Sequence, residues 1–161
     1  MKNFLYIVFI LPATLLAQSD IDHWEAVVLD GSTWNYLIPA TQPDASWLLP
    51  EFDDSQWLEG NSGSGYGDDD DETLVDPTMS IYLRHQFELE DLYAMDSALF
   101  FMDYDDGFVA YLNGIEITRG NAGELGEFVG WDQNLLIDHE AVLYSGGIPD
   151  AHPIDFASLL L

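Results

Sequence analysis

The chain has 161 residues, 48% of them hydrophobic, which is sufficient for one domain with its own core. Its 3 basic and 30 acidic residues give a formal net charge of -27, and such a surface disfavours binding to nucleic acid or anionic lipid. The absence of cysteine excludes disulfide bonds and a lipid-modified cysteine anchor, so packing has to supply the stability.

Residues 1–17 have the features of a secretory signal peptide. Lys2 precedes an apolar block over residues 4–11, and residues 15–17 resemble a cleavage site. The block is shorter than the ~20 residues that a membrane-spanning helix needs, so a membrane anchor is the weaker interpretation. We therefore expect a secreted or cell-surface protein whose mature domain covers residues 18–161, with no membrane segment after signal cleavage.

Two strands are predicted at the start of the mature domain. Glu25 to Leu29 and Trp34 to Ile38 are rich in β-branched and aromatic residues, and a turn-forming triplet separates them, which indicates a hairpin. Residues 39–67 hold three prolines, which cannot donate to a sheet ladder, so we expect a long ordered loop there. Its tryptophans, Trp47 and Trp57, either plug one end of the core or form an exposed platform for sugar rings.

A glycine-rich stretch at residues 63–67 leads into the acidic run Asp68-Asp69-Asp70-Asp71-Glu72. Phosphate binding is not expected, because no lysine follows and five acids would repel an anion. Carboxylates in a loop can instead hold calcium, although the spacing of an EF-hand is absent. The alternative is an ordinary solvated loop.

The second half of the chain is predicted to form strands joined by tight turns. Residues 81–89 alternate between apolar and polar types, as in a half-buried strand, and residues 97–102 form an apolar strand. Asp105-Asp106-Gly107 and Asn113-Gly114 then predict two successive hairpins, because Asn-Gly tolerates the positive φ of a type I′ turn. After a glycine-rich loop, Glu140 to Tyr144 is expected to be a further strand.

No stretch shows sustained helical periodicity, so the fold class is all-β, as an antiparallel sandwich. The alternation predicts that the core includes Leu83, Phe87, Leu99, Phe101, Val109 and Tyr111.

Few residues have the spacing that catalysis requires. The four histidines are scattered, without a zinc-binding pair. Asp105 and Asp106 are adjacent on a tight turn, so they do not face each other across a sugar ring as a hydrolase needs. They are expected to accept backbone amides, or to join a calcium site. Arg84 either forms an ion pair with one of these acids or holds a sugar or carboxylate ligand.

Several motifs of the chain occur together in one known family of modules. They are Trp34, Trp57, Gly65-Tyr66-Gly67, Tyr82-Leu83-Arg84, Asp105-Asp106-Gly107 and Tyr111-Leu112-Asn113-Gly114. With these motifs the chain resembles a galactose-binding-like jelly-roll module from large secreted proteins of Bacteroidota-type bacteria, found there beside CotH-type kinase, lamin-tail or phosphoesterase domains. The likeness covers about residues 24–161.

The resemblance implies a jelly-roll β-sandwich whose last strand lies beyond Leu161. It also implies carbohydrate or neighbouring domains of the same polypeptide as partners. The expected ligand-binding residues are Trp57, Tyr66 and Arg84. The acids themselves leave two alternatives open, a solvated acidic surface or a calcium site with Asp68, Asp70, Asp105 and Asp106 as its ligands.

Two functions follow from the sequence. The favoured one is a non-catalytic accessory module that binds carbohydrate or mediates domain contacts. The alternative is the leading part of a secreted enzyme, such as a kinase, phosphoesterase or glycoside hydrolase, whose chemistry is encoded after Leu161.

Overall fold

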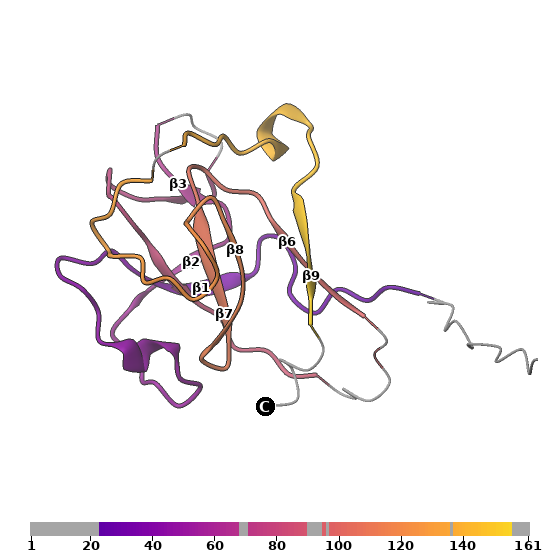
Figure 1. Cartoon of the computed structure of the whole chain (residues 1–161), viewed down its shortest axis with the longest axis horizontal. Helices are drawn as coiled ribbons and strands as arrows, with labels where there is room; N and C mark the ends of the chain where they lie inside the picture. Colours follow the sequence, from indigo (N-terminus) through magenta and orange to yellow (C-terminus); the bar gives the residue numbers. More distant parts are fainter. Residues whose placement is uncertain (1–22, 68–70, 90–94, 96, 136, 156–161) are drawn as a thin grey trace, which may run out of the picture.

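A computed structural model describes residues 23–67, 71–89, 95, 97–135 and 137–155 (Figure 1). The regular structure of these residues consists of β-strands and short 3-10 helices, without an α-helix, so the all-β prediction is confirmed. The strands form one three-stranded sheet and three two-stranded sheets. All the paired strands are antiparallel except β3 and β4, which are parallel.

The three-stranded sheet has the order β2-β1-β5. Its members are β1 (Thr33–Leu37), β2 (Leu58–Asn61) and β5 (Tyr82–Arg84). The prediction of a strand at residues 34–38 is confirmed, but its predicted partner at 25–29 is not a strand. The observed partner β2 contains Gly60, where a Cβ atom would lie 2.5 Å from the Thr73 side chain. The glycine therefore lets the next segment pack against the sheet.

The predicted loop at residues 39–67 contains regular structure, which corrects that interpretation. It holds the 3-10 helix η1 (Ala45–Leu48), strand β2 and strand β3 (Ser64–Gly65), which pairs with β4 (Thr73–Leu74). Helix η1 begins after Asp44, whose carboxylate accepts the Ser46 N–H at 2.9 Å. Hydrogen bonds from Ser46 hold the pKa of Asp44 below its usual value.

Of the two successive hairpins predicted at Asp105-Asp106-Gly107 and Asn113-Gly114, the second is present. Strands β7 (Phe108–Leu112) and β8 (Ile115–Gly120) pair across a two-residue turn at Asn113 and Gly114, whose φ values are 50° and 85°. Positive φ at both positions is the signature of the type I′ turn that the Asn-Gly pair predicts.

The other predicted hairpin is wrong. Strand β6 (Ala98–Met102) pairs with β9 (Asp150–Ile154) instead of with β7, and the two strands lie side by side in Figure 1. The chain does turn at Asp106, where φ is 60°, but the acids of this turn bind a distant segment. Asp105 accepts the Ala141 N–H at 2.7 Å, so the turn joins residues far apart in the sequence.

The predicted strand at residues 140–144 is replaced by a 3-10 helix, η3 (Leu143–Ser145). The two carboxylate oxygens of Asp103 accept the N–H groups of Val142 and Leu143, at 2.8 and 2.9 Å. These bonds occupy backbone donors that a sheet ladder would need, and they favour the helical turn.

The core is formed by half-buried aromatic side chains. Pro39, Gly120 and Ala122 are the buried residues of the described part of the chain, and Ala122 is 4% exposed. Phe100 packs against Phe108, with ring centroids 5.9 Å apart.

The predicted core list is correct only in part. Leu83, Leu99 and Val109 are partly buried. Phe87, Phe101 and Tyr111 are 40%, 55% and 36% exposed, which contradicts their prediction as core residues.

Each of these errors has a local cause. Phe87 lies beyond the end of β5. In β6 the inward residue is Phe100, so its neighbour Phe101 faces out, because successive strand residues alternate between faces. Tyr111 follows an irregularity in the β7–β8 register between Ala110 and Tyr111, and such an irregularity breaks the alternation.

Candidate functional site

A polar row crosses the three-stranded sheet. Asn35 in β1 lies opposite Glu59 in β2 on one side and opposite Arg84 in β5 on the other. Residues directly opposite in a sheet project from the same face, with neighbouring strands about 4.8 Å apart. The row therefore places a carboxylate, an amide and a guanidinium group across one face.

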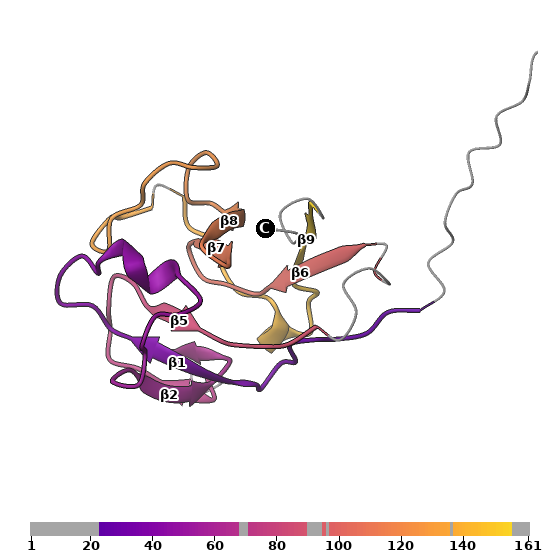
Figure 2. The same cartoon turned by 90° about the horizontal axis from the view of Figure 1, so that it is seen from below.

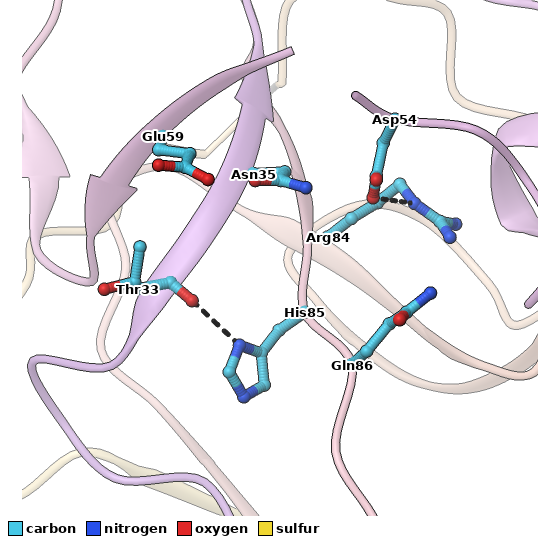
Figure 3. Close-up of a pocket in the computed structure, with 7 residues that line it drawn as sticks. All are labelled: Thr33, Asn35, Asp54, Glu59, Arg84, His85 and Gln86. Carbon is cyan, nitrogen blue, oxygen red and sulfur yellow. Dashed lines mark hydrogen bonds and ion pairs between the residues drawn. The ribbon is translucent and has the colours of Figure 1, made fainter. Parts of the chain in front are cut away.

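This row lies in an open pocket of about 250 Å³. Figure 3 shows the residues that line it, which are Thr33, Asn35, Asp54, Glu59, Arg84, His85 and Gln86. The side chains of Asn35, Arg84 and Gln86 extend in the same direction in this view, toward the side where Asp54 lies. Two amides, one guanidinium group and two carboxylates thus lie among the residues that line the pocket.

The Arg84 guanidinium group is held from two directions. Its Nε donates to the Asp54 carboxylate at 2.8 Å, and its Nη1 donates to the Trp47 carbonyl oxygen. The side chains of Arg84 and Asp54 are only 10% and 17% exposed. The guanidinium carbon lies 5.2 Å from the centroid of the Phe52 ring. Within the described residues, Arg84 donates hydrogen bonds from Nε and Nη1 but not from Nη2.

An aromatic cluster packs around Trp47, whose carbonyl oxygen accepts a hydrogen bond from Arg84. The Trp47 ring lies 6.4 Å from Trp57, 4.9 Å from Tyr82 and 5.9 Å from Tyr111, measured between centroids. Trp57 also contacts Phe52 edge-on at 5.7 Å. Burial, and then the nearby Glu116 carboxylate, raise the pKa of Tyr111. Trp47 and Trp57 are half-buried, and this packing fits the core-plug interpretation of the two tryptophans.

The remaining lining residues differ in how far their polar groups are already paired. His85 Nδ1 lies 2.9 Å from the Thr33 carbonyl oxygen, and its ring packs on Trp34 at 4.9 Å. Gln86 Nε2 makes a long bond of 3.4 Å to a backbone carbonyl. The side chains of Asn35 and Glu59 make no hydrogen bond to any described residue. The polar groups that lack a hydrogen bond to the described residues are therefore those of Asn35 and Glu59, which belong to the polar row.

The predicted ligand-binding residues lie in three different places. Arg84 lines the pocket, whereas Trp57 packs behind it against Phe52. Tyr66 follows β3, is 51% exposed and lies outside the pocket lining. The acid predicted to pair with Arg84 was Asp105 or Asp106, and the observed partner is Asp54.

The predicted calcium ligands are only partly within the described residues. Asp68 and Asp70 fall outside them. Asp105 accepts the Ala141 N–H, and the backbone of Asp106 bonds to His139 and Asn121. In residues 23–67, 71–89, 95, 97–135 and 137–155, no group of three or more histidines or acids is placed to hold a metal ion.

Sequence reasoning missed most of the pocket. Asn35 alternates with Trp34 and Tyr36 in β1, and this alternation is the signal that could have identified it as facing away from the aromatic side of the strand. Asp54 and Glu59 could not be assigned, because the segment around them was predicted to be a loop without strands. A better prediction of β2 would have placed Glu59 beside Asn35.

Comparison with known proteins gave no match to any protein-family model, curated protein or solved structure. The described part of the chain has no helix of the length and apolar character that membrane crossing requires.

Proposed function

We propose that this chain is a non-catalytic, carbohydrate-binding module of a secreted or cell-surface protein, with a neutral sugar bound at the polar row of the three-stranded sheet. The observation that carries the proposal is the grouping of Asn35, Asp54, Arg84 and Gln86 around one open pocket. Sugar hydroxyls both donate and accept hydrogen bonds, and amides and carboxylates on a rigid sheet supply the complementary groups.

The charge of the pocket favours a neutral ligand over an anion. Its lining contains the two acids Asp54 and Glu59 but only one arginine, and Asp54 already pairs with that arginine. The whole chain carries a formal charge of -27, which adds a long-range repulsion against anions. A neutral hexose or a neutral oligosaccharide fits these charges better than a uronic acid, a sulfated sugar or a nucleotide.

Arg84 is the predicted ligand residue with a geometric argument in its favour. Its ion pair with Asp54 and its contact with Phe52 fix the guanidinium plane, while Nη2 remains available as a donor. A fixed donor binds more tightly than a flexible one, because less side-chain entropy is lost on binding. Ligand contacts by Trp57 and Tyr66 stay predictions from the resemblance.

The galactose-binding-like jelly roll belongs to the same proposal. The resemblance motifs support it, and so does the antiparallel all-β architecture, although the sheets are small. An experimental structure of the mature chain in which the strands form two packed sheets would support this assignment. A structure in which the small sheets do not pack face to face would contradict it. Catalysis encoded beyond Leu161 remains the alternative prediction, and the reading frame downstream of that residue would test it.

Glycan binding tests the proposed function. The mature chain is screened against an array of neutral and anionic glycans, and hits are measured by calorimetry. We expect binding to neutral glycans, weakened about tenfold or more by Asn35→Ala and by Gln86→Ala, which is about 1.4 kcal/mol. Gln133→Ala removes an exposed amide outside the pocket and is the matched control. The proposal fails if no neutral glycan binds, or if the control variant loses as much affinity as the pocket variants.

Calcium binding also stays a proposal, and it has its own test. The melting temperature is compared in millimolar calcium and in chelator at constant ionic strength. If calcium raises the melting temperature and Asp70→Asn or Asp105→Asn abolishes this increase, the result would support a site at the predicted acids. An unchanged melting temperature would reject it.

A further inference from the structure

A second surface lies apart from the pocket, on the loop that follows β8. We call residues 120–130 the Arg119 loop, because the side chain of Arg119 holds it in place. Figure 2 shows this loop, in orange, extending beyond β7 and β8 at the edge of the molecule. It exposes two large apolar side chains, Leu125 at 68% and Phe128 at 77%.

The loop is fixed from within by an ion pair that is largely shielded from solvent. Arg119 donates from Nε and Nη2 to the two carboxylate oxygens of Glu116, at 2.5 and 2.8 Å. The side chains of Arg119 and Glu116 are 5% and 11% exposed. The bidentate geometry fixes the guanidinium plane, so the remaining donors point in defined directions.

These donors bind the loop backbone. Arg119 Nη1 donates to the Ala122 carbonyl oxygen at 2.6 Å, and Nη2 donates to that of Glu127 at 2.8 Å. The Glu116 carboxylate also accepts the Gly126 N–H at 2.9 Å. Two residues of β8 thus hold the beginning, middle and end of the loop, and the loop presents Leu125 and Phe128 on a rigid frame.

We infer that the Arg119 loop docks Leu125 and Phe128 into an apolar pocket, bordered by lysine or arginine, on another protein or protein domain. An exposed phenylalanine on a preorganised loop binds at a low entropy cost, and large buried side chains dominate the energy of protein interfaces. Glu124 and Glu127 flank the two apolar residues and are exposed, so a basic rim on the partner complements this surface.

The same charges argue against other occupants. A second copy of the chain would bring the same formal charge of -27 to the contact, and repulsion would weaken the complex. A membrane with anionic lipids would be repelled in the same way. The Arg119 loop therefore fits a protein partner of opposite charge.

The test uses a display library of short random peptides, selected on the mature chain. We expect the enriched peptides to combine lysine or arginine with large apolar residues, and their binding to weaken as salt is raised. Phe128→Ser and Leu125→Ser are each expected to weaken binding about tenfold or more. Leu74→Ser is the matched control, because Leu74 in β4 is 67% exposed and Leu125 is 68% exposed.

A further variant separates the rigidity of the loop from its composition. Glu116→Gln keeps both apolar side chains but removes the charge that holds Arg119, so we expect weaker peptide binding at a temperature where the variant remains folded. If Glu116→Gln binds the peptides with the affinity of the parent chain, the Arg119–Glu116 ion pair does not contribute to binding by holding the loop rigid.

The docking inference is overturned by any of three results. The first is that the enriched peptides bind the Leu125→Ser and Phe128→Ser variants with the same affinity as the parent chain. The second is binding to phosphatidylcholine vesicles that the same variants abolish. The third is self-association, seen by sedimentation, that depends on Phe128.

Discussion

Arg84 and Arg119 are the only basic residues that follow Lys2 in the chain, and each forms an ion pair with an acid in a shielded position. They differ in what the rest of the guanidinium group does. Arg119 uses all three of its nitrogens on Glu116 and on two loop carbonyls. Arg84 uses two and, within the described residues, leaves Nη2 unpaired beside the open pocket.

We propose that this difference separates a structural arginine, Arg119, from a ligand-binding arginine, Arg84. A saturated guanidinium group has no donor left for a ligand, and removing it leaves a carboxylate and several backbone groups without partners. A group with a spare donor contributes less to stability, but it can add a bond when a ligand arrives. The two side chains are similarly shielded, at 10% and 5% exposed, so the difference proposed here rests on their hydrogen-bond partners and not on burial.

The largest expected effect is loss of Arg119. Arg119→Ala leaves the Glu116 carboxylate shielded and without its cation, and removing one partner of a buried ion pair costs about 3 kcal/mol. Urea denaturation should show this loss in the free energy of unfolding. If Arg84→Ala costs as much as Arg119→Ala, the distinction between the two arginines is wrong.

A smaller effect is expected at the turn of the hairpin that carries Arg119. Gly114 has a φ of 85°, which a β-branched residue resists, so Gly114→Val should destabilise the fold by about 1 kcal/mol or more. Thermal melts of the two forms measure it. Gly114→Asn is the control, because asparagine tolerates a left-handed conformation. An equal loss in both variants would indicate crowding of the added side chain, whose Cβ would lie 3.5 Å from the Leu49 side chain, rather than backbone strain.

Arg84→Ala should cost about 1 kcal/mol of stability, because Arg84 makes two hydrogen bonds where Arg119 makes four. Its effect on glycan affinity should exceed its effect on stability. Arg84→Lys keeps the charge but not the planar group, and it should also weaken binding. Glycan affinity that is unchanged in both variants would assign Arg84 to a structural role, like that of Arg119.

The smallest expected effect is a pH dependence of the free energy of unfolding, caused by the Glu116 carboxylate that pairs with Arg119. The hydrogen bond from Arg119 holds the pKa of Glu116 below its ordinary value of 4.5. The unfolded chain then binds more protons near that pH, so this contribution is present above pH 4.5 and is lost as the pH falls below it. Urea midpoints measured across this range should show a shallower pH slope in Glu116→Gln. An identical slope in the variant and the parent would contradict this assignment.

Local signals allowed the sequence to predict one part of the fold well. Asn113 and Gly114 determine their turn through their own conformational preferences, so the β7–β8 hairpin could be predicted from adjacent residues. The same local logic failed at Asp105 and Asp106. There, the Asp105 side chain and the Asp106 backbone bind a segment that lies far along the chain, and no neighbouring residue indicates that partner.

The candidate pocket was hard to predict for a related reason. Arg84 was identified because a basic residue is rare in so acidic a chain. Glu59 was missed because β2 is short and contains glycine and asparagine, which have low strand propensity. The strand is specified by pairing with β1, and pairing between distant segments is information that periodicity does not carry.

The pairing of β6 with β9 has a consequence for the order in which the protein folds. Ala98 in β6 pairs with Ile154 in β9, so β6 has to wait for a strand that is made much later. During synthesis the β7–β8 hairpin can form as soon as residue 120 has been made, while β6, rich in phenylalanine, still lacks its ladder partner. Contacts between such distant residues slow folding, because the intervening chain must first be brought together. Until β9 pairs with it, the edge of β6 is therefore a segment prone to aggregation.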